Sequence, residues 1–326
     1  MAKNKSGQSL KDALSSVFAV SALLIALAAG VFIYIFIMGN PANFVGGNPE
    51  GHPLPGNFLG VIYKGGVIVP LLITGIVVIL IFTCERLITI EVARGGPIGY
   101  IVLKLILRIG TFALVLGGFF FLLFGSFVLG CILLAAAIIL FSVVTLSLNR
   151  YNAGTFIKKL QNYLAEDKIE DAIVECDNQK GSIANVVKST LSNYRAYQND
   201  TSLTKEQKLI AVQKDFDEAA TLEAPMLSKN LVFLSTLASL SVLVGLLGTV
   251  LGMVKAFAAL AQAGAPDALA LANGISEALI NTAFGIGGGA GAVILYNYFS
   301  SVIDGMTFKI DEAGMSIIQT FAAKTK

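Results

Sequence analysis

The stretch LVFLSTLASLSVLVGLLGTVLGMV, residues 231–254, contains no charged side chain and is long enough to decide the fold class. A helix needs about 20 apolar residues to cross the hydrocarbon core of a membrane. A span that only anchors would be mostly Leu, Ile, Val and Phe, yet this one contains Thr249 and is followed by Lys255. It also contains the glycines Gly245, Gly248 and Gly252. Small residues permit close helix packing, and polar residues can line a pathway, so both interpretations are open.

The composition of the whole chain agrees with a membrane protein. Of 326 residues, 55% are hydrophobic and only 13% are charged, against about 25% charged in soluble domains. The net charge of +2 and the absence of a basic stripe argue against nucleic acid. His52 is the single histidine, and the three cysteines are scattered, so we expect no metal site. Cys84 and Cys131 lie in or beside apolar runs and are interpreted as packing residues. No catalytic motif occurs, and we expect neither an enzyme nor a cofactor.

Uncharged runs predict six membrane-spanning helices. Single spans are expected at 17–38, 65–84, 231–254 and 273–299. The run 109–148 would be about 60 Å long as one helix, twice the thickness of the hydrocarbon core. It must therefore fold back as a helical hairpin, with its turn at Gly125-Ser126. The fold class is all-α, a polytopic helical membrane protein, and the first run is expected to be an uncleaved span because signal sequences have shorter apolar cores.

The lysines and arginines orient these spans. Of 23 such residues, 21 lie in segments that an even number of spans places on one side. Cytoplasmic segments are enriched in Lys and Arg, so both termini are predicted to be cytoplasmic. The exceptions are Lys64 and Lys255. The outer segment 39–63 is rich in Gly, Pro and Asn and is expected to be a loop in which His52 is solvated.

The remaining sequence is organised around the spans. The block 151–230 has apolar residues at helical spacing, and Thr204 with Gln207 predicts a capping box that opens a helix. That helix is expected to continue into the membrane as far as Lys255, with Pro225 as a kink. The predicted division is 1–64 (tail, extra span and outer loop), 65–96 (span), 97–150 (inserted hairpin), 151–230 (cytoplasmic helices), 231–300 (a paired span) and 301–326 (cytoplasmic helix).

Polar residues of the last two spans fall at matching depths. Counted inward from their outer ends, Thr249 and Thr282 both lie about 12–14 Å deep, and Lys255 and Glu277 share a level nearer the outer surface. Asn281 is four residues from Glu277 and shares its helix face. A charge inside a membrane is a functional hypothesis by default. The alternatives are a carboxylate stabilised at a helix start and hydroxyls bonded to their own helices.

The glycines of the last span, in GISEALINTAFGIGGGAG, do not have the strand context of a nucleotide site. Gly285/Gly289 and Gly287/Gly291 have the small-xxx-small spacing of closely packed helices. The predicted packing residues are Gly245, Gly248, Gly252, Gly285 and Gly289.

Four motifs resemble the MotA/TolQ/ExbB proton-channel family, its ExbB branch most closely. They are ERL (85–87), GLLGTVLGM (245–253), GISEALINTAFGI (274–286) and YNYF (296–299). The resemblance covers about 65–85 and 155–320. It implies a pentamer of long helices in the bacterial inner membrane, around the spans of a smaller ExbD-like protein with a proton-carrying membrane Asp. The family's pore threonines correspond to Thr249 and Thr282, and its pore-region glutamate to Glu277.

The implied activity is the use of proton motive force to drive a TonB-like protein for nutrient uptake across the outer membrane. A TolQ-like envelope motor or a motility stator remains an alternative. A solute transporter is a third possibility, although no paired halves with broken helices are visible. The chain departs from the family pattern at Gly291, where relatives often have proline, and at Lys255, a position usually neutral. The span 17–38 and the hairpin 109–148 are additional, and we expect them outside the ring, the hairpin because it contains no ionisable residue.

Overall fold

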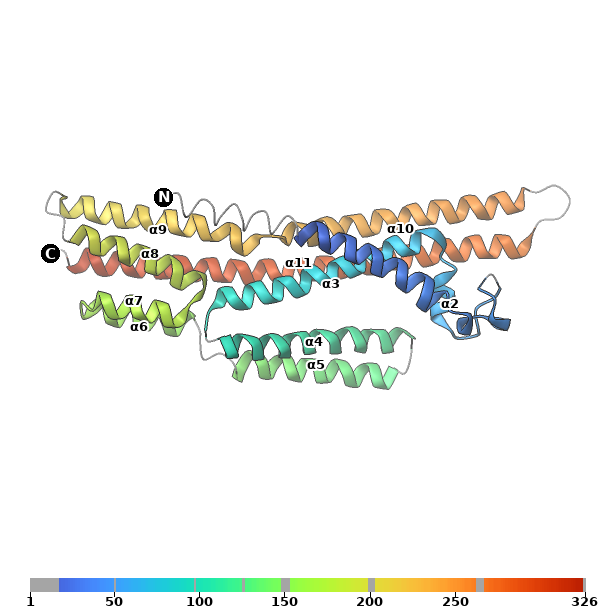
Figure 1. Cartoon of the computed structure of the whole chain (residues 1–326), viewed down its shortest axis with the longest axis horizontal. Helices are drawn as coiled ribbons and strands as arrows, with labels where there is room; N and C mark the ends of the chain where they lie inside the picture. Colours follow the sequence, from blue (N-terminus) through green and yellow to red (C-terminus); the bar gives the residue numbers. More distant parts are fainter. Residues whose placement is uncertain are drawn as a thin grey trace. The chain divides into compact units, whose positions relative to one another are not determined.

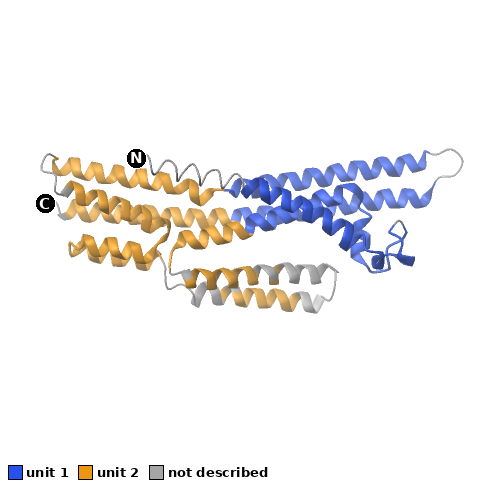
Figure 2. Cartoon of the chain, in the orientation of Figure 1, with its two compact units in different colours: residues 1–83, 230–297 blue, residues 84–229, 298–326 orange. Residues whose placement is uncertain are grey.

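The computed structural model describes residues 18–324, except 50, 97, 125–126, 148–152, 199–202 and 262–266. These residues are mostly helical, and they contain no β-strand beyond one isolated bridge, between Phe44 and Pro53. Figure 1 shows the helices, which confirm the all-α fold class. The chain divides into two compact units, 1–83 with 230–297 and 84–229 with 298–326 (Figure 2).

Four helical segments of the described residues are long and apolar enough to cross a membrane. They are Phe18–Met38, Gly66–Arg94, Lys205–Leu260 and Ala268–Ala323. Together with the composition, they make the chain a multi-pass membrane protein. Within these segments lie α3 (Val69–Arg94), α9 (Lys205–Ser228), α10 (Leu231–Leu260) and α11 (Ala268–Lys324).

The first span packs against α3 inside unit 1. A Cβ atom at Gly30 would lie 2.3 Å from Thr74 Oγ1, so the two helices touch where glycine leaves no side chain. Nearer the other end, the span finishes in a π-helical turn, η1 (Ile33–Met38). Tyr34 stacks there on Tyr63, with ring centroids 4.7 Å apart. The additional N-terminal helix is therefore an integral part of unit 1.

The segment 39–63 contains more regular structure than its composition predicted. It contains the short helices η2 (Pro41–Asn43), η3 (Val45–Gly47) and α2 (Phe58–Tyr63), followed by η4 (Gly66–Ile68). Asn43 explains much of this order, because its buried Nδ2 donates to Ile37 O (2.8 Å) and Met38 O (2.9 Å). His52 is exposed, as expected.

Unit 2 contains the inserted hairpin, formed by α4 (Ile98–Phe124) and α5 (Phe127–Ser147). These two helices pack on each other, while the expected turn at 125–126 lies outside the described residues. The first helix begins at Ile98, within the predicted insertion 97–150 but well before the uncharged run that starts at residue 109. It therefore includes Lys104 and Arg108, so the hairpin does carry charges.

Unit 2 also contains a helical block of α6 (Ala153–Ala165), α7 (Ile169–Gln179), α8 (Gly181–Gln198) and α9, together with the end of α3 and the part of α11 from residue 298 onward. Their apolar faces pack inward, burying Phe156, Leu160, Ala172 and Cys176 among others. The chain turns between α7 and α8, with positive φ at Lys180 (57°) and Gly181 (84°). The capping box that opens α9 is confirmed: Thr204 and Gln207 exchange side chain to backbone hydrogen bonds.

The predicted continuous helix from 205 to 255 is interrupted, which corrects the sequence interpretation. Pro225 lies inside α9, and the chain leaves the helix only after Ser228. Asn230 has the left-handed conformation (φ 62°), and α10 starts at the next residue. Arg86, whose side chain is 1% exposed, donates from Nη1 to Leu227 O at 3.1 Å. This bond satisfies a carbonyl that the helix end would leave without a partner.

Candidate functional site

The candidate residues lie on α10 and α11, which run antiparallel in contact within unit 1. Glycines set the closeness of this contact. A Cβ atom at Gly285 would lie 2.7 Å from Gly245 Cα, and one at Gly252 would lie 2.7 Å from Ala278 N. Backbone therefore meets backbone at these levels, as small residues permit in membrane helices. No other residue could replace these glycines without separating the helices.

The other predicted packing glycines divide into two groups. A Cβ atom at Gly248 would lie 2.5 Å from the Asn281 side chain, and one at Gly289 would lie 2.8 Å from Ala238 O. Gly287 and Gly291 would meet nothing within 4 Å. Among the described residues of the single chain, the small-xxx-small spacing of Gly287 and Gly291 therefore does not mark a close helix contact, unlike that of Gly285 and Gly289.

The structure brings the hydroxyls of Thr249 and Thr282 into direct hydrogen-bonding contact. Each hydroxyl also lies within hydrogen-bonding distance of a carbonyl of its own helix, Thr249 of Gly245 O at 3.2 Å and Thr282 of Ala278 O at 3.0 Å. Because the pair has only two protons, one hydroxyl donates to the other while the second donates to its own carbonyl. The two side chains are half-buried, so a further group can approach them. Each oxygen retains a lone pair, and either proton can leave its acceptor. The pair can therefore accept a hydrogen bond from an acid or donate one to a carboxylate.

Lys255 and Glu277 form an ion pair closer to the ends at which α10 and α11 are connected. Lys255 Nζ lies 2.6 Å from Oε1 and 2.9 Å from Oε2 of Glu277. The glutamate side chain is 11% exposed and the lysine 55%. The carboxylate is therefore shielded from solvent while the ammonium reaches it, an arrangement in which the lysine lowers the cost of burying the glutamate.

Glu277 and Asn281 contact the start of the span Gly66–Arg94, a feature that the sequence analysis missed. Asn281 Nδ2 donates to Gly65 O at 2.9 Å. Gly66 has φ +78°, and a Cβ atom there would lie 2.2 Å from Glu277 Oε1. Glycine at 66 thus supplies both the left-handed backbone and the space for the carboxylate. The Gly65-Gly66 pair before an apolar run could have indicated a close contact at this point. Its partners Glu277 and Asn281, however, lie over 200 residues away in the sequence.

Asn281 has a polar atom without a partner. Its side chain is wholly buried (0% exposed), and Oδ1 makes no hydrogen bond within the described residues. Buried amide oxygens nearly always find a donor. This oxygen is on the same helix face as Glu277 and one residue before Thr282, so the site has an acceptor available between its two polar levels.

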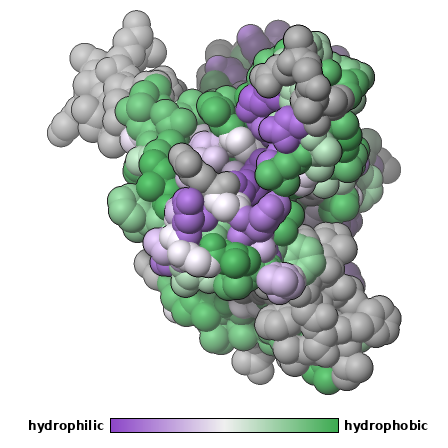
Figure 3. All heavy atoms as spheres, turned by 90° about the vertical axis from the view of Figure 1, so that its right-hand side faces the viewer, coloured by the Kyte–Doolittle hydropathy of each residue, from purple (hydrophilic) through white to green (hydrophobic). Residues whose placement is uncertain are grey.

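Around this polar centre, α10 and α11 present apolar side chains to their surroundings. Exposed examples are Leu243 (61%), Leu246 (58%), Val254 (60%), Leu279 (65%) and Ile294 (69%). In an end-on view from the right-hand side of Figure 1, hydrophilic residues gather in the middle of the face and hydrophobic residues surround them (Figure 3). Side chains of this kind require lipid or other protein subunits around them.

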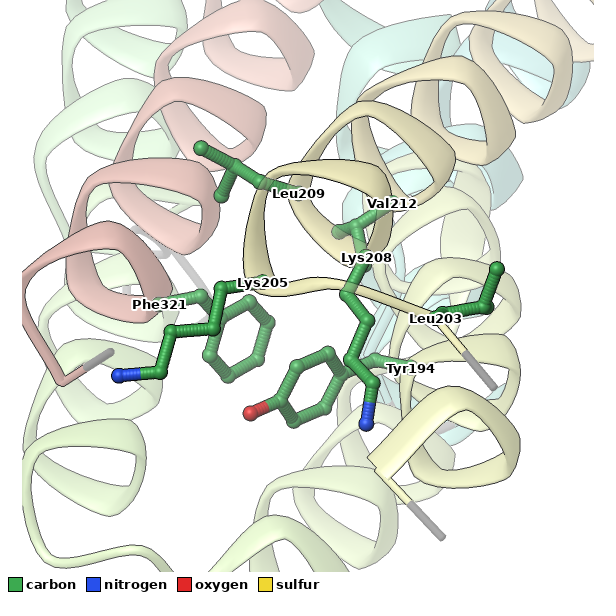
Figure 4. A pocket seen from close by; sticks show the side chains of 7 residues that line it. All are labelled: Tyr194, Leu203, Lys205, Lys208, Leu209, Val212 and Phe321. Atoms are coloured by element: carbon green, nitrogen blue, oxygen red, sulfur yellow. The ribbon is translucent and has the colours of Figure 1, made fainter. Parts of the chain in front are cut away.

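Unit 2 has a cavity of about 240 Å³ that does not involve any candidate residue. Tyr194 of α8 and Phe321 of α11 stack there with centroids 3.7 Å apart, beside Lys205 and Lys208 of α9 (Figure 4). Leu203, Leu209 and Val212 complete the lining. Burial raises the pKa of Tyr194, so its phenol stays protonated and neutral at physiological pH.

The cysteines differ from the sequence interpretation. Cys131 is exposed on α5, not packed, and Cys84 is half-buried. Cys176 is the buried thiol, and burial raises its pKa to about 12. No group of three or more metal-ligating side chains occurs among the described residues.

Comparison with known proteins gives the context for these residues. Residues 178–312 match the MotA/TolQ/ExbB proton channel family. A biopolymer transport protein ExbB of Pseudomonas putida is 29% identical over 147 residues, 44% of each chain. A Tol-Pal system protein TolQ of Pseudomonas aeruginosa is 43% identical over 83 residues, 26% of this chain and 36% of the relative. An ExbB of Xanthomonas campestris pv. campestris is 31% identical over 115 residues, 35% of this chain and 46% of the relative. The chain therefore spans less than half the length of these curated relatives.

Proposed function

We propose that this chain, whose residues 178–312 match the MotA/TolQ/ExbB proton channel family, is the proton-channel subunit of an inner-membrane motor. In this proposal the motor converts proton motive force into mechanical work on a TonB-like protein, for nutrient uptake across the outer membrane. The observation that carries the proposal is the contact between the Thr249 and Thr282 hydroxyls on two closely packed membrane helices.

The hydroxyl pair suits a carboxyl group that alternates between two protonation states. A carboxylate in a dry membrane setting has a raised pKa and needs donors for its charged form. Thr249 and Thr282 can turn their protons from their own helices to such a carboxylate. When the acid is protonated, its O–H can donate to a threonine oxygen instead. The pair thus serves both states without contributing a fixed charge that would trap one of them.

We propose that this carboxyl group belongs to a partner, an ExbD-like protein with a single span that contains an Asp. Among the described residues, the α10–α11 pair itself has only Glu277 as a membrane carboxylate, and Lys255 already binds it. The half-buried threonines leave room for an approaching side chain. A homopentamer would place five such pairs around the partner's spans, giving equivalent sites between which the Asp can move.

The outer polar level has a separate proposed role. The Glu277 carboxylate, the Lys255 ammonium and the buried Asn281 Oδ1 lie outward of the threonines. From Thr282 to Glu277 is five residues, about 7.5 Å along the helix. This level can order water at the outer mouth and supply protons to the hydroxyl level. The tight glycine packing of Gly245 and Gly285 holds the two levels in register.

Assembly follows from the exposed apolar surface in this proposal. Subunits pack side by side, and lipid covers the outermost helices. In this proposal the long helical block and both termini lie in the cytoplasm, and the loop 39–63 and the α10–α11 connection lie on the periplasmic side. The excess of Lys and Arg in the first set of segments supports this orientation.

A Tol-Pal type of motor is the second candidate, because the TolQ relative has the higher identity, 43% against 29%, although over a shorter segment. The same site would then energise envelope maintenance. A motility stator and a solute transporter are weaker alternatives.

Co-purification tests the proposal. The full chain, expressed in its native host with an affinity tag and extracted in mild detergent, should bring down a small protein with one N-terminal span containing an Asp, and a five-fold assembly by native mass spectrometry. Co-purification of a TonB-like protein would indicate the first motor, and co-purification of a Tol-Pal protein would indicate the second. Purification of the chain as a single subunit without such a partner would contradict the proposal.

A further inference from the structure

A buried carboxylate on α3 is surrounded by more positive charge than it can neutralise. Glu91, whose side chain is 2% exposed, binds Arg94 Nη1 (2.9 Å) and Arg108 Nη1 (2.5 Å) through Oε1. Its Oε2 lies 3.3 Å from Lys104 Nζ. Arg94 is on the same helix, while Lys104 and Arg108 come from α4 of the inserted hairpin. We call these four residues the Glu91 cluster.

The cluster has a surplus of two positive charges. Three cations face one carboxylate, and within the described residues no second carboxylate lies within 4 Å of any of the three. The side chains of Lys104 and Arg108 are only 10% and 8% exposed, so water cannot fully solvate them. Buried cations in excess are costly and normally find an anion. The cluster therefore lacks an anionic component.

A second observation points to the same lack. Arg108 Nε is buried and makes no hydrogen bond within the part of the chain described. A guanidinium has five N–H donors in a fixed fork, and phosphate oxygens match that fork well. Both oxygens of Glu91 are already engaged by other nitrogens. An additional acceptor is needed at Arg108.

The position of the cluster identifies where this acceptor comes from. Arg108 directly precedes the uncharged run 109–148, and Glu91 lies seven residues beyond the uncharged run 65–84, about 10 Å along the helix. Headgroup regions add roughly 5–8 Å to each side of the hydrocarbon core. The cluster extends from the end of one uncharged run, at Arg108, to about 10 Å beyond the other, at Glu91, so it includes the level of lipid phosphates. Arg94, 28% exposed, forms its open edge.

We propose that the Glu91 cluster is a binding site for the phosphate group of an anionic phospholipid. The phosphodiester contacts Arg94 and Lys104 at the open edge and accepts from Arg108 Nε, which neutralises the surplus charge. Glu91 holds the three cations in position. The lipid then forms part of the attachment between the inserted hairpin and α3, and phosphatidylglycerol should be preferred to phosphatidylcholine, whose headgroup is neutral overall.

Native mass spectrometry of the delipidated full chain, titrated with dioleoylphosphatidylglycerol or dioleoylphosphatidylcholine, tests this site. Each basic residue near anionic lipid contributes about 1 kcal/mol, or roughly five-fold in affinity. The variant Arg94→Gln/Lys104→Gln should therefore lose about 25-fold in phosphatidylglycerol affinity. The matched control, Lys159→Gln/Arg195→Gln, removes two exposed cations of the same unit, each ion-paired with a glutamate, and should change nothing.

Glu91→Gln distinguishes a lipid site from a purely structural ion-pair cluster. Removing the competing carboxylate should raise phosphatidylglycerol affinity several-fold in a chain that circular dichroism shows to be folded. If Glu91→Gln does not fold, the affinity of Arg94→Gln/Lys104→Gln still decides between a lipid site and a purely structural cluster. Equal binding of the two lipids by the wild-type chain would overturn the proposal, as would unchanged affinity in Arg94→Gln/Lys104→Gln. Displacement of the lipid by excess inorganic phosphate would overturn the lipid assignment in favour of a free anion.

Discussion

The ion pair between Lys255 and Glu277 should respond asymmetrically to mutation. Lys255→Met leaves a carboxylate that is 11% exposed without its partner, whereas Glu277→Gln leaves an ammonium that is 55% exposed and can turn to water. Removing one member of a buried pair costs about 3–5 kcal/mol, and exposed pairs contribute about 0.2–1 kcal/mol. The expected losses in unfolding free energy are therefore about 3 kcal/mol for Lys255→Met and about 1 kcal/mol for Glu277→Gln.

The double variant should cost less than the sum of the single ones. With neither charge present, about 2 kcal/mol should be lost, which corresponds to a coupling of about 2 kcal/mol. Unfolding of the purified protein in mixed micelles, followed by helical circular dichroism, measures the four free energies. Lys309 and Glu312, an exposed pair on α11, supply the control cycle. Their coupling should stay below about 0.5 kcal/mol.

Two outcomes would refute this reasoning. Additive single effects would mean that the two side chains do not interact in the membrane. A larger loss for Glu277→Gln than for Lys255→Met would mean that the carboxylate is not the buried member of the pair.

Three further variants probe packing, the helix break and burial. Gly285→Ala should separate α10 from α11, because its Cβ would lie 2.7 Å from Gly245 Cα. The expected loss in unfolding free energy, measured by the same assay, is about 2–4 kcal/mol. A loss under about 0.5 kcal/mol would show that the helices are not in backbone contact. Arg86→Leu should leave Leu227 O without its donor and cost about 1–3 kcal/mol, whereas hydrogen exchange near residue 227 equal to wild type would argue against that bond. Cys176, whose pKa is raised from 9.0 to about 12 by burial, should be alkylated at pH 8 on the order of a thousand-fold more slowly in the folded chain than after unfolding. Because the folded state holds this thiol neutral, stability should be constant below about pH 9 and fall as pH rises toward 12; equal alkylation rates would show that the thiol is accessible.

Local patterns predicted much of the fold. The capping box at Thr204 follows from the residue types and their spacing, and the hairpin of α4 and α5 follows from the length of an uncharged run. The break before α10 was missed, because the helix was predicted to continue past Pro225 with only a kink. A proline in a helix frees one carbonyl but does not force an end, whereas the left-handed Asn230 does interrupt the helix.

Contacts between candidate residues at the same depth on two consecutive helices were also predictable. Depth counting put Thr249 beside Thr282, and their hydroxyls meet because the two helices are joined by a short connection. Contacts of Glu277 with Gly66, and of Glu91 with Arg108, could not be found this way. They depend on which faces of non-adjacent helices pack together, and no periodicity within either segment contains that information.

The central claim is that the Thr249–Thr282 hydroxyl pair serves a partner's proton-carrying Asp. Thr→Val keeps the side-chain shape and removes the hydroxyl. After either substitution the remaining threonine still bonds its own helix, through Gly245 O or Ala278 O. Folding should therefore change by less than about 1 kcal/mol.

The deciding measurement is proton flux driven by a membrane potential into proteoliposomes that contain the chain and its co-purified partner. The account predicts that Thr249→Val and Thr282→Val assemble with the partner at wild-type levels yet lose the flux, and with it force-dependent uptake in cells. The matched Thr282→Ser, which keeps the hydroxyl, should retain most of it. Wild-type flux in Thr282→Val with normal complex levels would contradict the account.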